Sequence, residues 1–261
     1  MNMEDISTQL LYTTVPIYAK KRSGAFTSGT GFIFSITEEE NKSIPLLITN
    51  YHVLEDAVAG FVELHIAKDD MPSEESVRVQ FDESIINGNK LGELDLIAVP
   101  LASTLNDFQN RGINVFYRTV DPSILPSRQQ VDEFAAIENI TFIGYPSGLY
   151  DVKNKIPLIR QGITATPIWN SYQGREVFLI DAGVFPGSSG SPVFIYNQGS
   201  FPTKNGIAIG NRLHFVGVIV ETMLRNEDNT NSYLDLGIVI NGKAVYREIK
   251  EFVKKIKGKD S

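Results

Sequence analysis

Residues 186–196 read PGSSGSPVFIY, a turn rich in Gly and Ser that leads directly into a short apolar run. Gly187 can adopt backbone angles that are closed to other residues, so a tight loop can form before the run. In such a loop the amides of Gly187 and Ser189 can converge on one point and bind an anion. An ordinary surface turn explains the same residues, so this stretch does not decide its own role.

Short apolar runs like the one after this turn fill most of the chain. They are rich in β-branched and aromatic residues, and clusters of Gly, Pro, Asn and Asp separate them. The clearest runs cover residues 31–34, 45–49, 94–99, 140–144, 177–180, 192–196 and 215–220. Repeated strands without long helices between them predict an all-β sandwich or barrel.

Two segments depart from this texture. Residues 116–135 carry two Pro and weak periodicity, which is typical of a connector between two β units. Residues 243–257 place apolar side chains on one helical face and end in several Lys, which predicts a C-terminal helix. The expected layout is a first β unit over residues 1–115, a connector over 116–135, and a second β unit over 136–261.

Composition narrows the class of protein. The chain has 261 residues, a net charge of −7 and no Cys, and its Lys and Arg are not concentrated in one stretch. A nucleic-acid-binding role is therefore not expected, since it needs a basic footprint. Disulfides and thiolate metal sites are excluded. The N-terminus lacks a secretory signal and no segment is apolar enough to span a bilayer, so the expectation is a cytoplasmic protein with no membrane partner.

Histidine is the usual base that activates a Ser hydroxyl, and this chain has only three. His65 and His214 lie within or beside strand-like runs, where surface strand positions explain them. His52 differs, because it follows the apolar run 45–49 as the chain enters a short turn. The end of a buried strand is where a rigid scaffold presents functional side chains.

Asp95 lies between Leu94 and Leu96 at the start of an apolar run. A carboxylate there is costly to bury unless it is paired, and an imidazole is a natural partner. If Asp95 stood alone, a strand-edge Asp facing water would explain it better. The three candidates follow one another in the order His52, Asp95, Ser189, with the first two in the first β unit.

Six segments in this order resemble a trypsin-like serine peptidase, closest in texture to the bacterial Deg/HtrA catalytic domains. The similarity runs from about residue 25 to 257 and rests on residues 28–33, 47–53, 95–99, 143–149, 181–192 and 215–220. It implies two six-stranded antiparallel β-barrels of the chymotrypsin type with a C-terminal α-helix. The chain stops after that helix, so the peptide-binding regulatory domain of many Deg proteins is not expected.

The resemblance assigns roles to these residues. His52, Asp95 and Ser189 form a catalytic triad, and the amides of Gly187 and Ser189 form the oxyanion hole. The resemblance also assigns substrate-binding positions.
They are Gly183 at the pocket base and Val220, Glu221 and Thr222 on its wall. Thr222 narrows the pocket, which favours small or medium aliphatic side chains, whereas a Glu221 turned inward would favour a basic one. The resemblance implies a polypeptide substrate and no metal or cofactor.

Some residues of the chain differ from the family pattern, and they leave other interpretations of its function open. Ser188 replaces the usual Asp before the nucleophile, so other contacts or the substrate must hold the oxyanion loop. Ser191 replaces a common Gly and is a rival hydroxyl. A catalytically silent sensing domain, or a peptidase switched on by an activating protein partner, therefore stands beside an active peptidase. An esterase of the α/β-hydrolase type is disfavoured, because its order is Ser, acid, His and a helix follows its Ser.

Overall fold

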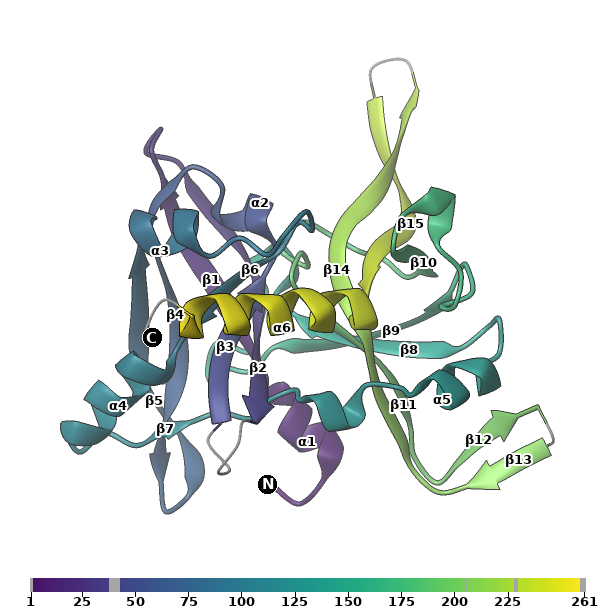
Figure 1. Cartoon of the computed structure of the whole chain (residues 1–261), viewed down its shortest axis with the longest axis horizontal. Helices are drawn as coiled ribbons and strands as arrows, with labels where there is room; N and C mark the ends of the chain where they lie inside the picture. Colours follow the sequence, from purple (N-terminus) through teal and green to yellow (C-terminus); the bar gives the residue numbers. More distant parts are fainter. Residues whose placement is uncertain (1, 38–42, 205, 228–229, 259–261) are drawn as a thin grey trace.

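The computed structural model describes residues 2–37, 43–204, 206–227 and 230–258, and its two β units lie side by side (Figure 1). The strands of the N-terminal unit are β1 (Thr14–Lys21), β2 (Phe26–Thr37), β3 (Ser43–Thr49), β4 (Ala57–Lys68), β5 (Met71–Asp82), β6 (Ile97–Pro100) and β7 (Val115–Phe116). Those of the C-terminal unit are β8 (Asn139–Gly144), β9 (Leu158–Thr164), β10 (Val177–Asp181), β11 (Pro192–Asn197), β14 (Arg212–Glu227) and β15 (Thr230–Asn241). The hairpin of β12 (Ser200–Thr203) and β13 (Gly206–Ile209) projects from the second unit.

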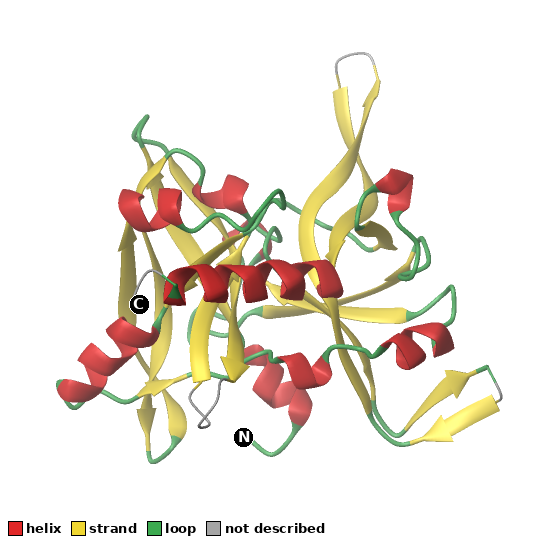
Figure 2. Cartoon of the chain, in the orientation of Figure 1, coloured by secondary structure: helices red, strands yellow, loops and turns green. Residues whose placement is uncertain are grey.

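Apart from the 16-residue α6, the helices are short, and they lie around the strands (Figure 2). They are α1 (Ile6–Leu11), α2 (Tyr51–Leu54), α3 (Glu83–Gly88), α4 (Ala102–Asn110), α5 (Arg128–Glu133), α6 (Gly242–Lys257) and the 3-10 turns η2 (Pro122–Ile124), η3 (Pro146–Gly148) and η4 (Tyr172–Gly174). Among the described residues, no helix combines the length and the apolar character needed to cross a membrane.

The two units differ in closure. The C-terminal strands close into an antiparallel six-stranded barrel in the order β10-β15-β14-β11-β8-β9. The N-terminal strands follow the path β5-β4-β1-β2-β3-β6, with β7 beside β4, and within the described residues β5 and β6 do not pair. The prediction of two six-stranded barrels is confirmed for the second unit, whereas the described residues of the first unit do not show a closed barrel. Helix α3 follows β5 directly and contacts β4, β5 and β6, so a helix takes the place of a closing ladder.

Residues 31–34 of β2 and 45–48 of β3 form continuous apolar runs because both faces of the strands are buried there. Successive side chains of a strand point to opposite faces. Leu46 and Ile48 therefore enter the core shared by the two units, whereas Leu47 enters the core of the N-terminal sheet. Phe32 and Ile33 divide in the same way along β2. The two strands are thus fixed on both sides, which makes their ends rigid supports for loops.

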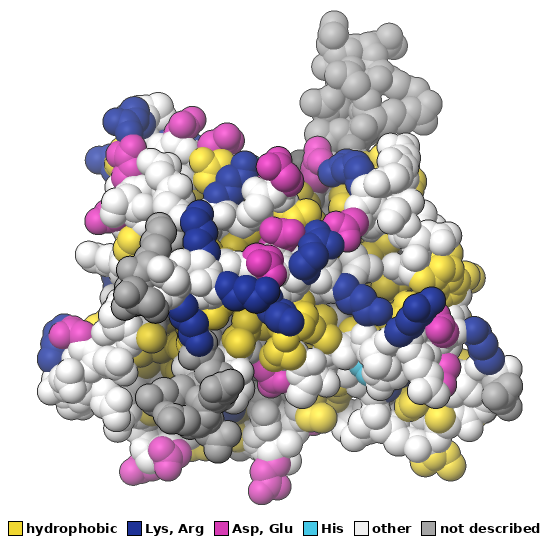
Figure 3. All heavy atoms as spheres, in the orientation of Figure 1, with side chains coloured by type: hydrophobic (Ala, Val, Ile, Leu, Met, Phe, Trp, Pro, Cys, Tyr) yellow, Lys and Arg dark blue, Asp and Glu magenta, His cyan; other side chains and the backbone are white. Residues whose placement is uncertain are grey.

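Helix α6 confirms the predicted C-terminal helix, beginning one residue earlier at Gly242. Its apolar face, including Val245 and Ile249, packs into the shared core, and the Asn241 side chain caps its first turn. Figure 3 shows charged side chains of both signs along its outer face. The helix covers the core residues that both β units contribute, so it fastens the two units together.

Candidate active site

His52 lies in the one-turn helix α2, immediately after the buried strand β3. The turn is anchored from both sides. Val53 and Leu54 are buried in the N-terminal core. The Asn50 side chain and the Tyr51 amide both donate to the Asp95 carbonyl, at 2.8 and 3.2 Å. The backbone around His52 is therefore held firmly, while its side chain remains 44% exposed.

Asp95 pairs directly with His52, as the sequence predicts. Its Oδ2 lies 2.5 Å from Nδ1 of the imidazole, and its Oδ1 accepts the His52 amide at 2.9 Å. A carboxylate can only accept at these positions when ionised, so Nδ1 carries the proton. This leaves the Nε2 lone pair of a neutral His52 free to take a proton from another group.

The loop around Ser189 consists of two consecutive tight turns. The Ser188 amide donates to the Phe185 carbonyl at 2.9 Å, and the Ser191 amide donates to the Ser188 carbonyl at 3.0 Å. Gly187 and Gly190 have φ values of +88° and +89°. Residues with a Cβ rarely adopt this conformation, so the two glycines in the sequence are required by the turns.

Thr30 of β2 ties this loop to the N-terminal sheet. Its amide donates to the Ser189 carbonyl at 3.0 Å, and its hydroxyl donates to the Gly187 carbonyl at 2.7 Å. The Thr30 carbonyl in turn accepts the Thr49 hydroxyl at 2.7 Å, three residues before His52 along the chain. The loop of Ser189 and the turn of His52 thus meet at one junction between the two β units.

Sequence reasoning did not assign a role to Thr30. Its signal is the Gly29-Thr30-Gly31 pattern: a Cβ at Gly29 would lie 2.7 Å from Val53, and one at Gly31 would lie 2.8 Å from Leu47. Glycines on both sides of a polar residue indicate that other parts of the chain approach closely there.

The Ser189 hydroxyl donates to the Val220 carbonyl at 3.1 Å, and the described residues show no hydrogen bond between Ser189 and His52. Val220 lies at a register shift between Ile219 and Glu221, where β14 bulges against β15. A bulge leaves a residue outside the ladder, which explains why this carbonyl is available. The structure therefore joins His52 to Asp95 and gives Ser189 a different partner.

The amides of Gly187 and Ser189 donate to no acceptor within the described part of the chain. Their orientation is fixed by neighbours. The Pro186 carbonyl accepts the Ser147 amide at 2.5 Å, and the Ser188 carbonyl, which shares its peptide with the Ser189 amide, accepts the Ser191 amide at 3.0 Å. A trans peptide points its C=O and N–H in opposite directions, so the Gly187 amide faces away from Ser147. These contacts orient the Pro186–Gly187 and Ser188–Ser189 peptides, and Ser188 stands where the family has an acidic residue.

The two serines beside Ser189 are buried. Ser188 is 1% exposed and Ser191 is fully buried, and neither hydroxyl has a hydrogen-bond partner among the described residues. The Ser191 hydroxyl lies so close to Gly144 that a Cβ there would collide with it. Ser191 is therefore a poor rival to Ser189, whose side chain is only partly buried.

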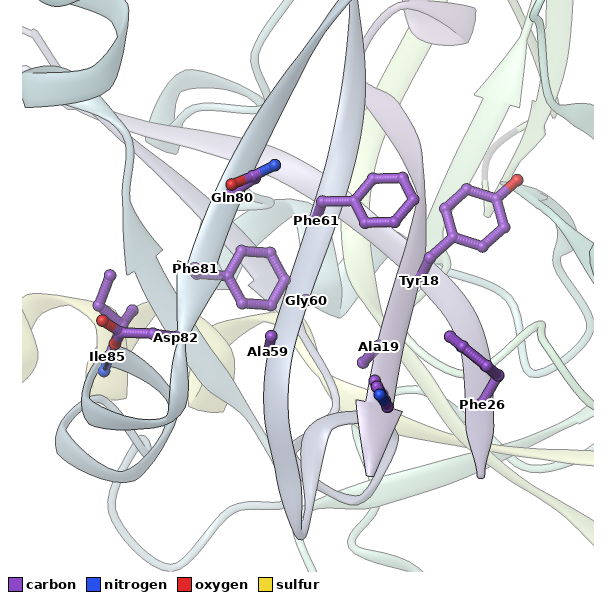
Figure 4. A pocket seen from close by; sticks show the side chains of 11 residues that line it. Tyr18, Ala19, Phe26, Ala59, Gly60, Phe61, Gln80, Phe81, Asp82 and Ile85 are labelled. Carbon is purple, nitrogen blue, oxygen red and sulfur yellow. Dashed lines mark hydrogen bonds between the residues drawn. The ribbon is translucent and has the colours of Figure 1, made fainter. Parts of the chain in front are cut away.

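The predicted pocket residues lie on two elements beside the loop. Gly183 follows β10 directly and precedes the first tight turn. Val220, Glu221 and Thr222 follow one another on β14, where Glu221 is exposed and the Thr222 hydroxyl bonds the Leu236 carbonyl at 3.4 Å. A separate hollow of about 450 Å³ lies at β1, β4 and β5 of the N-terminal sheet, between Tyr18, Phe61 and Phe81 (Figure 4). None of the candidate site residues lines it.

The other two histidines serve structural positions. His65 on β4 is half-buried and contacts the carbonyls of Ser73 and Lys155, at 2.8 and 3.2 Å. His214 on β14 is 8% exposed and packs against Phe134, so the prediction of a surface position is wrong for it. Successive side chains of β14 point to opposite faces, and His214 lies on the face that Phe134, directly after α5, covers. Burial and the charge of neighbouring Arg212 hold the pKa of the His214 imidazole below its ordinary 6.5.

Comparison with known families identifies this architecture. The family described as trypsin-like peptidase domain matches residues 29–201, which is more than half of the chain. The chain belongs to the trypsin-like peptidase domain family. The matched region of this trypsin-like domain contains His52, Asp95 and Ser189.

Two solved proteases share the fold of this trypsin-like domain. The HtrA-type protease AlgW, solved with a tripeptide, is 16% identical with a TM-score of 0.53, over 95% of this chain and 62% of AlgW. The thermostable serine protease AL20 from an extremophilic microorganism is 15% identical with a TM-score of 0.50, over 91% of this chain and 95% of AL20. The chain spans less than two thirds of AlgW, and at these identities the likeness is one of fold. No curated protein matches the chain.

Proposed function

We propose that the protein is a serine endopeptidase in which His52, Asp95 and Ser189 act as a catalytic triad. The observation that carries this proposal is the pairing of His52 Nδ1 with Asp95 at 2.5 Å, which leaves Nε2 free at the junction where the Ser189 loop lies. The family of the chain supports peptidase chemistry.

The first half of the reaction forms an acyl-enzyme. Ser189 leaves the Val220 carbonyl by rotation about its Cα–Cβ bond and attacks the carbonyl carbon of the scissile peptide. Its proton passes to His52 Nε2, and Asp95 stabilises the resulting imidazolium. The amides of Gly187 and Ser189 donate to the oxyanion. The C–N bond then breaks, and the leaving amine takes the proton from His52.

The second half releases the acyl group. Water gives one proton to His52 and attacks the ester carbonyl of Ser189. The C–O bond to Ser189 breaks, the product acid leaves, and the proton on His52 returns to the Ser189 oxygen. Both halves use only side chains and amides of the chain, so this mechanism requires no metal or cofactor.

The substrate in this proposal is a polypeptide whose residue before the scissile bond enters a pocket. Gly183 forms the base of this pocket, and Val220, Glu221 and Thr222 form its wall. The preference for small or medium aliphatic side chains rests on Thr222 narrowing the pocket, and it stays a prediction. The cytoplasmic location likewise stays a prediction from the sequence.

A second candidate function has one observation in its favour. The Ser189 hydroxyl bonds the Val220 carbonyl rather than His52. A domain held in this state would be catalytically silent. It would act either as a sensing module or as a peptidase that becomes active when a protein partner turns Ser189 toward His52. Catalytic hydrogen bonds often tighten only when substrate is bound, so the same observation fits an active enzyme.

Labelling with a fluorophosphonate probe tests the proposal. Wild type is expected to be labelled, and Ser189→Ala is expected to lose all labelling because the nucleophile is gone. Ser188→Ala is the matched control, since its buried hydroxyl has no partner among the described residues and its loss leaves the loop intact. Equal labelling of wild type and Ser189→Ala, or none in either with the purified chain, contradicts an active Ser189. Labelling that requires an added protein fraction supports the partner-activated form.

A further inference from the structure

Arg160 of β9 extends over the interior of the C-terminal barrel. It pairs in register with Phe142, a core residue that is 1% exposed, so both side chains stand on the same face of the sheet. The guanidinium carbon lies 5.7 Å from the centre of the Phe142 ring and 4.9 Å from that of Phe185. Two aromatic rings thus hold the guanidinium in place while Arg160 is only partly exposed.

The guanidinium lies in the space that a side chain at Gly183 would fill. A Cβ at Gly183 would lie 2.9 Å from Nη2 of Arg160 and 3.3 Å from the Phe185 ring. Phe185 opens the tight turn that presents the Gly187 amide. The positive charge is therefore adjacent to the loop of Ser189, and the absence of a side chain at Gly183 is what leaves room for it.

Arg160 has no acidic partner among the described residues. Within the described part of the chain, the only interactions of its guanidinium are the two ring contacts, with no hydrogen bond and no ion pair. Arg212 in the same barrel shows the contrast, because Glu138 and Asn197 take up its guanidinium. A partly buried guanidinium without a carboxylate is poorly satisfied, since burial weakens its hydration and screening.

The other side of the Ser189 loop is closed to a substrate side chain. Thr30 bonds the Ser189 and Gly187 carbonyls, and a Cβ at Gly190 would collide with the Thr30 carbonyl. The residue that acylates Ser189 must therefore direct its side chain toward the C-terminal barrel, where Gly183 and Arg160 lie.

We infer that Arg160 selects a substrate with an acidic residue, Asp or Glu, immediately before the scissile bond. This inference rests on the proposed function, which puts Gly183 at the base of the pocket. A guanidinium stacked on rings still presents its N–H edges, and two parallel N–H groups match a carboxylate. This preference would replace the aliphatic one predicted from Thr222, because an aliphatic side chain would leave those donors unpaired. A Lys or Arg side chain would be repelled. The exposed Glu221 on the pocket wall does not pair with Arg160.

Six peptide amides that differ only in the residue before the cleaved bond test the inference: Glu, Gln, Asp, Asn, Val and Lys. Glu and Gln have the same shape, so their ratio of kcat/KM isolates the charge. Wild type is expected to prefer Glu to Gln by about 10- to 100-fold, the range of one charge-assisted hydrogen-bond pair. Arg160→Met is expected to abolish this ratio, Arg160→Lys to keep part of it, and Arg160→Glu to favour the Lys peptide.

Arg78→Met is the matched control. Arg78 also stacks on a ring, 4.5 Å from the centre of Phe61, but on the outer face of the N-terminal sheet. It is expected to leave the Glu-to-Gln ratio unchanged, which separates loss of a stacked Arg in general from loss of this one. Thermal melting of each variant reports whether it is folded. If Arg160→Met fails to fold, the Glu-to-Gln ratios of kcat/KM for wild type and Arg160→Lys still test the acidic preference.

The outcomes separate this inference from the proposed function. Fluorophosphonate labelling of Ser189 together with a preference for Val or Lys overturns the acidic preference and leaves the peptidase standing. An unchanged Glu-to-Gln ratio in folded Arg160→Met does the same. Absence of labelling and of cleavage of all six peptides overturns the proposed function, and the selectivity with it.

Discussion

Two polar clusters of this protein each contain a side-chain contact of the same length, but the two clusters differ in burial and in the partners that their groups have. His52 and Asp95 are 2.5 Å apart with side chains 44% and 33% exposed, whereas Arg212 and Glu138 are 2.5 Å apart with side chains 9% and 3% exposed. In the Arg212 cluster each group has its partners: Glu138 also accepts the Ala135 amide at 2.9 Å, and Arg212 also donates to Asn197 at 2.8 Å.

The His52 cluster is different because some of its hydrogen-bonding groups have no partner. Within the described residues, Nε2 of His52 and the amides of Gly187 and Ser189 have no partner. Buried polar groups with all partners present contribute to a unique fold. Polar groups that are held in place but unpaired can act on a ligand. The comparison therefore separates a structural cluster from a candidate catalytic one by what each leaves free.

Replacing Asp95 with Asn tests the His52 cluster and carries the largest expected effect. The amide offers an N–H to Nδ1 and stabilises the wrong tautomer of His52. A fall in kcat of about 10⁴-fold is expected, equal to about 5.5 kcal/mol of transition-state stabilisation. The measurement is cleavage of a peptide amide at saturating concentration. The thermal midpoint should barely change, since exposed pairs contribute at most about 1 kcal/mol. A decrease of less than tenfold would remove Asp95 from the triad.

Replacing Glu138 with Ala tests the Arg212 cluster. It leaves a buried guanidinium without its carboxylate, which costs about 3–5 kcal/mol in unfolding free energy. Urea denaturation measures this loss. Glu176→Ala is the matched control, because Glu176 pairs with Arg247 at side-chain exposures of 50% and 51% and should cost less than about 1 kcal/mol. Similar losses in both variants would show that burial does not distinguish the two pairs.

Replacing Gly190 with Ala tests the contact between the Ser189 loop and Thr30. Gly190 and Gly24 have nearly the same φ, +89° and +87°, but only Gly190 has the Thr30 carbonyl where a Cβ would lie. Gly24→Ala should cost about 1–2 kcal/mol for its backbone conformation alone. Gly190→Ala should cost about 2–4 kcal/mol, because crowding adds to that strain. Denaturation and labelling of Ser189 measure both variants, and equal costs would contradict the close approach.

Lowering the pH tests the burial of His214 beside Arg212. The expected change in the free energy of unfolding is the smallest of the four. The pKa of His214 is below 6.5 in the folded chain, so the unfolded chain binds the proton more readily. Stability from this group is present above pH 6.5 and is lost as the pH falls below it. Urea denaturation of wild type between pH 7.5 and 5.5 should show this loss, and His214→Gln should show less of it. The same slope in both would assign the pH dependence to other groups.

Local patterns predicted much of the fold. The apolar runs correspond to strands of both units, and the face of Val245 and Ile249 predicted helix α6. These patterns repeat over two or four residues, so they can be read without knowing the rest of the chain. Closure could not be read this way. Whether β5 meets β6 depends on α3, a six-residue helix whose own sequence does not show what it contacts.

In the candidate site too, local sequence signals identified some residues, whereas others depend on distant contacts. His52, Asp95 and Ser189 were found from residue type, order and scarcity, and their roles stay a proposal. Thr30 and Ser147 were missed because their partners, Gly187 and Pro186, lie far away along the chain. The glycines beside Thr30 indicate a close approach there, but the sequence does not show which part of the chain approaches.

The sequence alone determined which segments form strands, where the last helix runs and which hydroxyl, imidazole and carboxylate could act together. Tertiary structure decided that one sheet closes and the other does not, that His214 is buried, and that Arg160 reaches Gly183 without a carboxylate beside it. The physical reason is range. Strand and helix patterns depend on neighbours a few residues away, whereas pairing and burial depend on which distant surfaces the fold brings together.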